Sequence, residues 1–181
     1  MSIQVTNRKS IIKKYNSSAA VYDSLYRKEQ ILKRQKIVES GLKLGYKLLD
    51  IGCGTGVSMI DEKPIDYSVG LDISIEMLRL ARKKRKEVIL GDMTSIPFRD
   101  NSFDSLTFVT SFHHAPKKRR IINDILRIVK PGGYVCSSLL KKAKVRKQIE
   151  ALTRKELKLV YLEDANTDLI LILKKTNYNS F

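Results

Sequence analysis

The residues best suited to bind a ligand lie in Leu48–Gly56, with the sequence LLDIGCGTG. An apolar run that ends in an acid is typical of a buried strand, and glycines alternating with small residues are typical of a loop that lies against a ligand. Glycine lets the backbone approach a cofactor closely and adopt positive φ. Nucleotide and dinucleotide sites share this pattern, so the identity of the ligand must be inferred from residues later in the chain. The candidate cofactor-binding residues here are Asp50, Gly52, Cys53, Gly54 and Gly56.

Two further acids follow strands at informative spacings. Asp72 comes about 20 residues after the loop, at the end of the strand Tyr67–Leu71, where a carboxylate can accept both hydroxyls of a ribose. Ile73 follows Asp72 and is a candidate residue of the same cofactor site. The alternative role for Asp72 is to cap the next helix. Asp92 ends a third strand and can accept from the exocyclic amine of adenine, with Met93 or Ile96 against the ring. The alternative is that Asp92 only forms a turn.

The chain contains two histidines, His113 and His114, directly after the strand Ser105–Ser111. In sheets of parallel strands, the chemistry takes place just outside the carboxyl ends of the strands. A histidine there can act as a general base near neutral pH, so both are candidate catalytic residues. The alternative is that this loop only shapes the pocket.

The elements that position these residues alternate between strand and helix. A helix is expected from Ser17 or Ser18 to Gly41 or Gly45, and its neighbouring tyrosines can close over a cofactor. Tyr22 is the one assigned to the cofactor site, with Tyr15 and Tyr26 as alternatives. The other expected helices are a short one at 57–63, one at 75–86, one from Pro116 to the KPGG stop, and a basic one at 141–158.

Five strand-and-helix alternations precede two C-terminal strands with a tight turn at Asp164–Asn166. This order predicts an α/β domain with a mostly parallel sheet and helices on both faces. We expect one domain over residues 1–181, in which residues 1–46 form a basic helical extension or lid. Residues 1–47 hold eleven Lys or Arg and three acids.

Composition limits the classes of partner. The net charge of +16 favours a polyanion such as nucleic acid, although lysine-rich surfaces also occur where they only add stability. Cys53 and Cys136 lie far apart, so neither a disulfide framework nor a metal site is expected. No apolar run is long enough for a membrane span, and the first residues lack a secretory signal. These features predict a cytoplasmic protein.

As a set, DIGCGTG, GLDIS, GD, PFRDNSFD, FHH and LRIVKPGG resemble the class I S-adenosylmethionine (SAM)-dependent methyltransferases over residues 47–140, in the subgroup of the ubiquinone and menaquinone biosynthesis enzymes. The resemblance implies a Rossmann-like sheet of seven strands, whose last strand is antiparallel, and SAM as the cofactor. It also implies site roles. The glycines line the amino acid moiety above Asp50, Asp72 holds the ribose, Asp92 and Met93 hold the adenine, and the methyl group is presented near Thr110, Ser111 and Phe112.

A second resemblance is to the tRNA wobble-uridine carboxymethyl methyltransferases. It rests on the short first helix, the PFR segment, the histidine pair, and the paired Arg119 and Arg120. The N-terminal helix and the segment after Ser138 depart from that group. The NPPY motif of amide and adenine methylating relatives is absent, and no cysteine stands where a covalent mechanism would need one.

Three functions follow as hypotheses. The first is a methyltransferase acting on structured RNA such as tRNA, for which a chain without an added RNA-binding module is expected to need a partner subunit. The second is a methyltransferase for a small molecule or a protein side chain. The third is a binding protein that kept the fold without turnover. Transfer of a radioactive methyl group from SAM to the components of a cell extract distinguishes the three hypotheses. Label in RNA supports the first, label in the protein or small-molecule fraction supports the second, and the third predicts no label.

Overall fold

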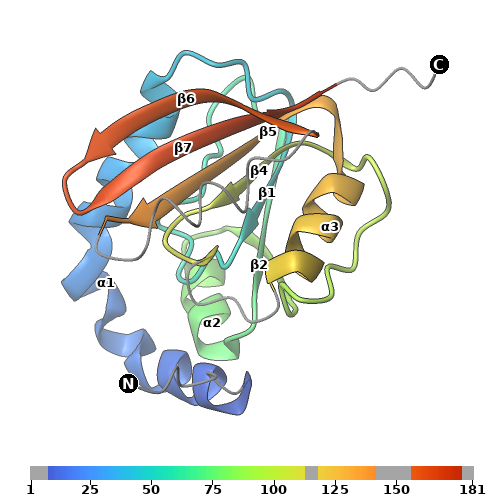
Figure 1. Cartoon of the computed structure of the whole chain (residues 1–181). Helices are drawn as coiled ribbons and strands as arrows, with labels where there is room; N and C mark the ends of the chain where they lie inside the picture. Colours follow the sequence, from blue (N-terminus) through green and yellow to red (C-terminus); the bar gives the residue numbers. More distant parts are fainter. Residues whose placement is uncertain (1–7, 113–117, 142–155, 177–181) are drawn as a thin grey trace, which may run out of the picture.

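A computed structural model describes residues 8–112, 118–141 and 156–176, and in them seven strands form one sheet with helices on both faces (Figure 1). The elements are α1 (Arg8–Glu39), β1 (Lys47–Ile51), β2 (Tyr67–Asp72), α2 (Ile75–Lys83), β3 (Glu87–Leu90), β4 (Phe103–Phe108), α3 (Lys118–Ile128), β5 (Val129–Leu140), β6 (Leu157–Ala165) and β7 (Asp168–Lys175).

The strand order is β3-β2-β1-β4-β5-β7-β6. Strands β1 to β5 pair in parallel, whereas β7 is antiparallel to both β5 and β6. This arrangement confirms the predicted mostly parallel sheet with an antiparallel C-terminal hairpin. The chain builds outward from β1 to β3 and then returns to the other side of β1 with β4. The carboxyl ends of β1 and β4 therefore border the crevice where such sheets bind ligands.

Alternating side chains of β7 pack on the two faces of the sheet. Leu171 and Leu173 belong to one core cluster, together with the buried isoleucines of α3. Ile170 and Ile172 belong to a second cluster, which contains Ile37 of α1. Because successive strand residues point to opposite faces, α1 and α3 cover opposite sides of the sheet, as Figure 1 shows.

Helix α1 starts earlier than predicted. Neither Ser17 nor Ser18 is its N-cap, because both lie inside the helix. Their hydroxyls donate to backbone carbonyls three residues earlier, at 3.0 Å to Lys14 and 3.4 Å to Tyr15. A serine that bonds back in this way can remain inside a helix. The additional turns bring the start of α1 over the carboxyl edge of the sheet, where they become part of the site.

Other boundaries also differ from the predictions. Residues 57–63 are not helical, since Met59 and Ile60 are instead buried in a turn-rich segment ahead of Pro64. The KPGG segment lies inside β5, and α3 ends directly before it. The C-terminal turn falls at Asn166 and residue 167, slightly later than expected. The predicted helix at 141–158 lies mainly in 142–155, outside the described residues.

Within the described ranges, no helix is both long and apolar enough to cross a membrane.

Candidate active site

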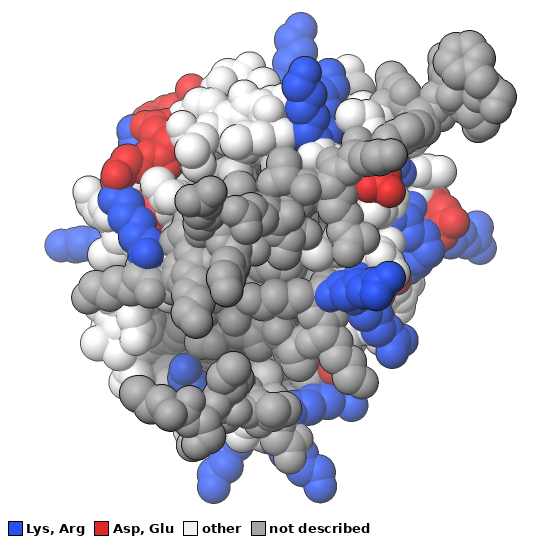
Figure 2. All heavy atoms as spheres, in the orientation of Figure 1, with Lys and Arg blue, Asp and Glu red and all other residues white. Residues whose placement is uncertain are grey.

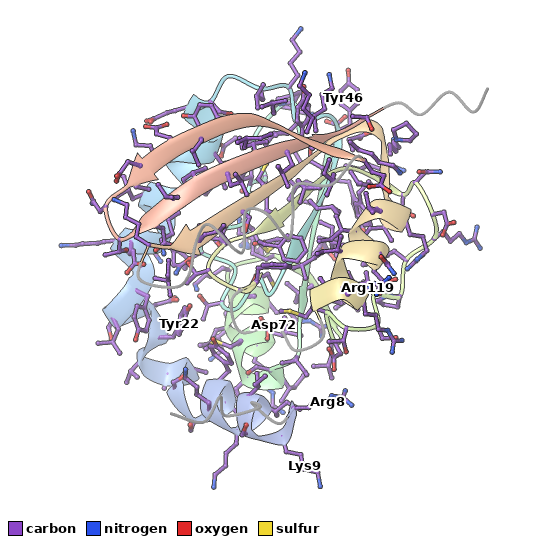
Figure 3. All side chains as sticks on the ribbon, in the orientation of Figure 1. Arg8, Lys9, Tyr22, Tyr46, Asp72 and Arg119 are labelled. Carbon is purple, nitrogen blue, oxygen red and sulfur yellow. The ribbon has the colours of Figure 1, made fainter. Side chains whose placement is uncertain are left out.

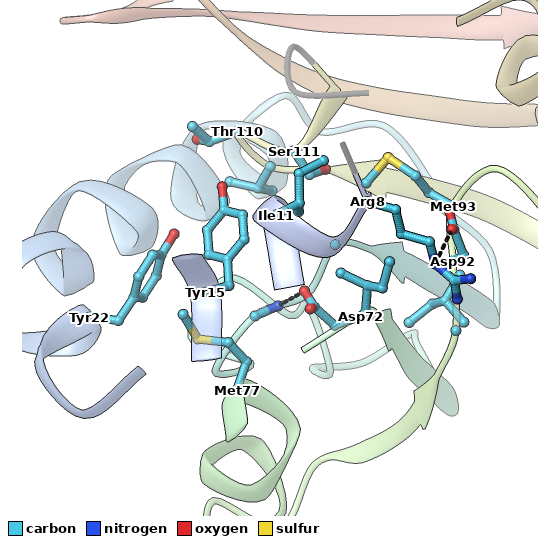
Figure 4. Close-up of a pocket in the computed structure, with 16 residues that line it drawn as sticks. Arg8, Ile11, Tyr15, Tyr22, Asp72, Met77, Asp92, Met93, Thr110 and Ser111 are labelled. Carbon is cyan, nitrogen blue, oxygen red and sulfur yellow. Dashed lines mark hydrogen bonds and ion pairs between the residues drawn. The ribbon is translucent and has the colours of Figure 1, made fainter. Parts of the chain in front are cut away.

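A cavity, called here the cofactor pocket, opens at the carboxyl ends of β1, β2 and β4 (Figure 4). The loop after β1, the residues after β2 and β3, and the loop after β4 form its walls. The first turns of α1 close it from the outside. The predicted residues that line it are Tyr22, Gly52, Gly54, Asp72, Ile73, Asp92, Met93, Thr110 and Ser111.

The first two glycines of the loop, Gly52 and Gly54, form one wall of the pocket. Gly52 has φ of 77°, and a Cβ atom on it would lie 2.4 Å from the Cβ of Ser111. Its N–H donates to the Leu71 carbonyl at 2.7 Å, which ties the loop to the end of β2. Gly54 also has positive φ, 54°, with open space where a side chain would be. The loop therefore leaves backbone atoms facing the cavity.

Asp72 lies at the end of β2 with its carboxylate in the pocket wall. Its Oδ2 accepts the N–H of Gly54 at 2.9 Å, drawn as a dashed line in Figure 4, and its Oδ1 accepts the N–H of Ser74 at 2.8 Å. Burial raises the pKa of Asp72, while these backbone N–H groups oppose the rise. A carboxylate can accept four hydrogen bonds, so both oxygens retain capacity for hydroxyl donors. Ser74, rather than Asp72, caps α2.

At the other end of the pocket, Asp92 makes contacts that the sequence did not predict. The guanidinium of Arg8 lies 3.1 Å from Asp92 Oδ2, and the N–H and hydroxyl of Thr94 each donate to Oδ1 at 2.8 Å. Met93 lines the pocket beside it, whereas Ile96 is buried in the core instead. Asp92 therefore forms a turn and also lines the cavity, and its contact with adenine stays a prediction.

Arg8 and Ile11 are pocket residues that sequence analysis missed. Both belong to the first turns of α1, which the serine-cap interpretation placed outside the helix. Arg8 and Ile11 do not belong to any sequence motif that indicates a cofactor site. The only available signal was their helical spacing from Tyr15, which also lines the pocket.

Tyr15 and Tyr22 cover the pocket from α1. Burial, together with the nearby Asp72 carboxylate, raises the pKa of Tyr15 to about 12, and burial also raises the pKa of Tyr22. Both phenols are therefore neutral hydrogen-bond donors at physiological pH. Tyr26 packs on Tyr22 with ring centroids 5.0 Å apart and does not line this pocket.

Three predicted cofactor residues support the loop and do not line the cavity. Asp50 is fully buried in β1, where Thr107 donates to its Oδ1 at 2.9 Å, and its Oδ2 has no hydrogen-bond partner among the described residues. The sulfur of Cys53 packs toward Gly70. Gly56 faces α2, and a Cβ there would meet side-chain atoms at 2.9 Å. Direct cofactor contact by these three residues stays a prediction.

The buried Asp50 makes stability depend on pH. Burial raises its pKa to about 7, although the Thr107 hydroxyl lowers it. The pKa of this acid is higher in the folded state than in the unfolded state. Such a group contributes its full stabilisation at pH values below its unfolded-state pKa. The contribution is lost as the pH rises to its folded-state pKa. Between pH 4 and pH 7 we expect stability to fall by about 1.4 kcal/mol per pH unit from this group. Urea unfolding across that range measures the slope.

Asp50→Asn is the matched control for this prediction, because it keeps the shape and removes the titration. The difference in unfolding free energy between the two proteins should shrink toward low pH. Parallel pH profiles for the two proteins would show that Asp50 is ionised throughout.

The loop after β4 contributes Thr110 and Ser111 to the pocket. The Ser111 hydroxyl donates to the Ile51 carbonyl at 2.6 Å, and Thr110 has the left-handed φ of 58°. Phe112 is fully buried behind them, edge-on to Phe108. His113 and His114 follow but lie outside the described residues, so their catalytic role stays a prediction.

A second cavity, called here the acceptor cavity, adjoins the cofactor pocket. It lies between α1, the end of β5 and the turn between β6 and β7. Tyr15, Tyr22 and Thr110 line both cavities and so mark their junction. Leu25 and Leu140 give the second cavity apolar surface, and other lining residues supply amide, hydroxyl and charged groups. Two ligands could therefore meet at Thr110.

Comparison with known proteins fits this geometry. Residues 49–137 match the family model described as a methyltransferase domain. A demethylmenaquinone methyltransferase of Paenarthrobacter aurescens is 31% identical over 144 residues, which cover 70% of this chain and 56% of that protein. The tRNA (carboxymethyluridine(34)-5-O)-methyltransferase of Arabidopsis thaliana is 31% identical over 97 residues, covering 52% of this chain and 24% of that protein. The chain thus spans about half the first relative and a quarter of the second.

Among solved structures, one complex combines the Haloferax volcanii Trm112 methyltransferase activator with a methyltransferase. This chain matches it with a TM-score of 0.79 at 17% identity, over 94% of this chain and 100% of that one. At that identity the match shows the fold. The chain belongs to the class I SAM-dependent methyltransferases. The methyl donor of this family is SAM, which carries an amino acid, a ribose and an adenine.

The residues that line the pocket of this chain fit SAM. Gly52 and Gly54 give an open backbone wall that a Cβ at Gly52 would obstruct. Asp72 offers carboxylate oxygens midway along the cavity, and Met93 offers apolar surface at the far end. The buried Asp50 Oδ2, which lacks a partner among the described residues, lies beneath the loop where the cationic end of the cofactor is expected. The donors and acceptors present therefore match the three parts of the cofactor.

Proposed function

We propose that this protein transfers a methyl group from SAM to a nucleotide of structured RNA such as tRNA. The observation that carries the proposal is the charge of α1 beside the cofactor pocket. Its first two turns hold Arg8, Lys9, Lys13 and Lys14, and its first acid is Asp23. Lys9 projects from the molecule at this end of the helix (Figure 3).

Helix stability does not account for this charge. The N-terminus of a helix carries a partial positive charge, so acids are favoured and cations are disfavoured there. In α1 the first turn has no acid, and one of its cations, Arg8, lies at the wall of the pocket. Lys and Arg also project around the outline of the face in Figure 2, so a polyanion would meet positive charge beyond α1. RNA phosphates would be attracted to this positive charge.

We propose that the acceptor cavity receives one unstacked base. Tyr15, Tyr22 and Tyr26 offer aromatic surface on which a base can stack, which contributes about 1–3 kcal/mol per base. Lys14 and Lys141 also line the cavity and suit the flanking phosphates. Methyl transfer to a base requires it to leave the helical stack, and this cavity would receive it beside Thr110.

Each part of the cofactor has a proposed partner. The Gly52–Gly54 loop holds the amino acid end with Asp50 beneath it, Asp72 accepts from the ribose hydroxyls, and Asp92 with Met93 holds the adenine. SAM supplies an activated methyl group on its sulfonium. The chain's own residues then need to align the acceptor and exclude water, which Tyr15 and Tyr22 do as a lid formed by α1. We propose His113 or His114 as the base for an acceptor that carries a proton.

We also propose that a partner subunit completes the enzyme in the cytoplasm. One support is the structural match to a protein that was solved with a Trm112 activator. A second support is β3, an edge strand whose Ile89 and Leu90 are 37% and 56% exposed. An exposed apolar edge strand invites pairing with another chain, and a small activator subunit is the occupant we propose.

A small-molecule acceptor is the second candidate. The similarity to a demethylmenaquinone methyltransferase favours it, and so does the apolar surface that Leu25 and Leu140 give to the acceptor cavity. An acceptor of this kind needs an enclosed apolar site and no basic rim. The role of the charge on α1 therefore separates the two candidates.

Neutralising Lys9 and Lys13 tests that role. We expect Lys9→Gln with Lys13→Gln to lower RNA affinity, and to reduce the slope of log K against log salt by up to about one unit for each lost phosphate contact. Titration of fluorescent tRNA at several salt concentrations measures both. The matched control is Lys43→Gln with Lys47→Gln, which removes two exposed charges at the opposite edge of the sheet. Equal slopes for the two double variants would show that Lys9 and Lys13 of α1 do not contact RNA.

A further inference from the structure

The side chain of Lys33, in α1, is completely buried, and its ammonium joins parts of the chain far apart in sequence. Its Nζ donates to the Thr110 hydroxyl at 2.7 Å, lies 2.9 Å from Oδ2 of Asp168, and pairs with Glu29 one turn earlier in the helix. Asp168 is also fully buried, as the first residue of β7. Three oxygen-bearing groups thus surround an ammonium that has three N–H donors.

Stability alone is a weak explanation for this arrangement. Removing charges from water is costly, and a buried ion pair is often replaced by apolar side chains without loss of stability. Ile37, one turn further along α1, shows the apolar alternative, because it joins the core cluster on the same face of the sheet. Buried polar groups do impose specific geometry, so the groups that Lys33 contacts are informative.

The first of these groups is Thr110, at the junction of the two cavities. Its φ of 58° is unusual for a β-branched residue and costs energy unless neighbours hold it. The Thr110 N–H donates to the Ser138 hydroxyl at 2.7 Å, and Lys33 donates to the Thr110 hydroxyl. The Thr110 and Ser138 hydroxyl oxygens also lie 3.2 Å apart, so β5 holds the strained residue at its backbone and side chain and α1 holds its side chain.

The second group is Glu29, whose carboxylate lines the acceptor cavity. Its side chain is 38% exposed, and it is the one acid among the described residues that line this cavity. Lys33 therefore fixes two cavity side chains at once, a hydroxyl at the junction and a carboxylate further in. Neither side chain could shift without breaking a bond to a buried charge.

We propose that Lys33 is a positioning residue for methyl transfer, acting through Thr110 and Glu29. It sets the wall against which the acceptor lies, so that the acceptor atom meets the methyl group in line. A misplacement of about 1 Å can lower a rate by about 10²-fold. The inference rests on the acceptor cavity proposed above and holds for RNA or for a smaller acceptor.

The first test replaces Lys33 without leaving the fully buried Asp168 carboxylate unpaired. In Lys33→Met with Asp168→Asn, we expect kcat to fall at least about tenfold, while SAM affinity by calorimetry stays within about threefold. The rate is measured well below the melting temperature, on the extract fraction that the wild type labels. The control Lys130→Met removes another Lys–Asp pair, with Asp104 at the far edge of the sheet. A double variant with a lower melting temperature and wild-type kcat would overturn the proposal.

The second test leaves Lys33 in place. Thr110→Ser keeps the hydroxyl that accepts from Lys33, and Thr110→Ala removes it, while both relieve the β-branched strain. We expect kcat of Thr110→Ala to be at least about tenfold lower than that of Thr110→Ser. Equal rates would contradict the positioning role. The wild-type enzyme labels one fraction of the extract, and that fraction shows separately whether RNA is the acceptor. A failure of the RNA proposal can therefore be told apart from a failure of the Lys33 proposal.

Discussion

Asp72→Ala is expected to weaken SAM binding by about 10²- to 10³-fold. The estimate assumes two charge-assisted hydrogen bonds from the ribose hydroxyls, which together contribute about 3–4 kcal/mol. The substitution also removes the acceptor for the N–H groups of Gly54 and Ser74, so the loop loses an anchor. Isothermal titration calorimetry with SAM measures the affinity directly.

Asp72→Asn separates the two effects of this substitution. The amide keeps one oxygen that can accept from the backbone, but it has no charge and cannot accept from both ribose hydroxyls as a carboxylate does. The amide nitrogen replaces one of the two oxygens that accept a backbone N–H, and this loss offsets the gain from removing a buried charge, so we expect the asparagine variant to be no more stable than the wild type in thermal unfolding. Wild-type SAM affinity in Asp72→Ala would refute the ribose assignment.

Gly52→Ala is the second substitution with a large expected effect. The added methyl would lie 2.4 Å from the Ser111 Cβ and 3.6 Å from the Met93 Cε, between two residues that line the pocket. Overpacking costs about 1–3 kcal/mol, and left-handed φ adds about 1–2 kcal/mol for alanine. We expect SAM affinity to fall roughly 10- to 100-fold, with a clear loss of stability in urea unfolding.

Gly41→Ala provides the matched control, because Gly41 has a similar φ of 69° with no atoms within 4 Å of the added carbon. It follows α1 and lies away from the pocket. We expect it to lose about 1–2 kcal/mol of stability from backbone strain and to bind SAM normally. If Gly52→Ala bound SAM as well as Gly41→Ala does, the glycine wall would not contact the cofactor.

The parts of the site that are local in sequence were predictable. Gly52 and Gly54 follow β1 and Asp72 ends β2, and in the structure they line one cavity because those strands are parallel neighbours. The order of strands and helices, with a closing hairpin, was sufficient to predict the sheet. Resemblance to a family then added SAM and the antiparallel last strand.

The rest depends on contacts between distant residues. Arg8 reaches Asp92 only because α1 begins nine residues before the expected serine cap, and no local rule places that start. Lys33 resembles the many surface lysines of this basic chain in sequence. Its burial depends on Asp168, 135 positions later, so the pairing emerges only when α1 packs against β7. Residues 57–63 were mistaken for a helix because their apolar side chains enter the core from a turn.

The most direct test of the central claim is transfer of radioactive methyl from SAM to a total extract of the source organism. The extract is separated afterwards into RNA, protein and small-molecule fractions, and the reaction is run with and without an added Trm112-type subunit. Asp72→Ala serves as the control for cofactor-dependent labelling. We predict label in the RNA fraction, increased by the added subunit and lost in the variant. Label confined to the small-molecule or protein fraction would contradict RNA as the acceptor.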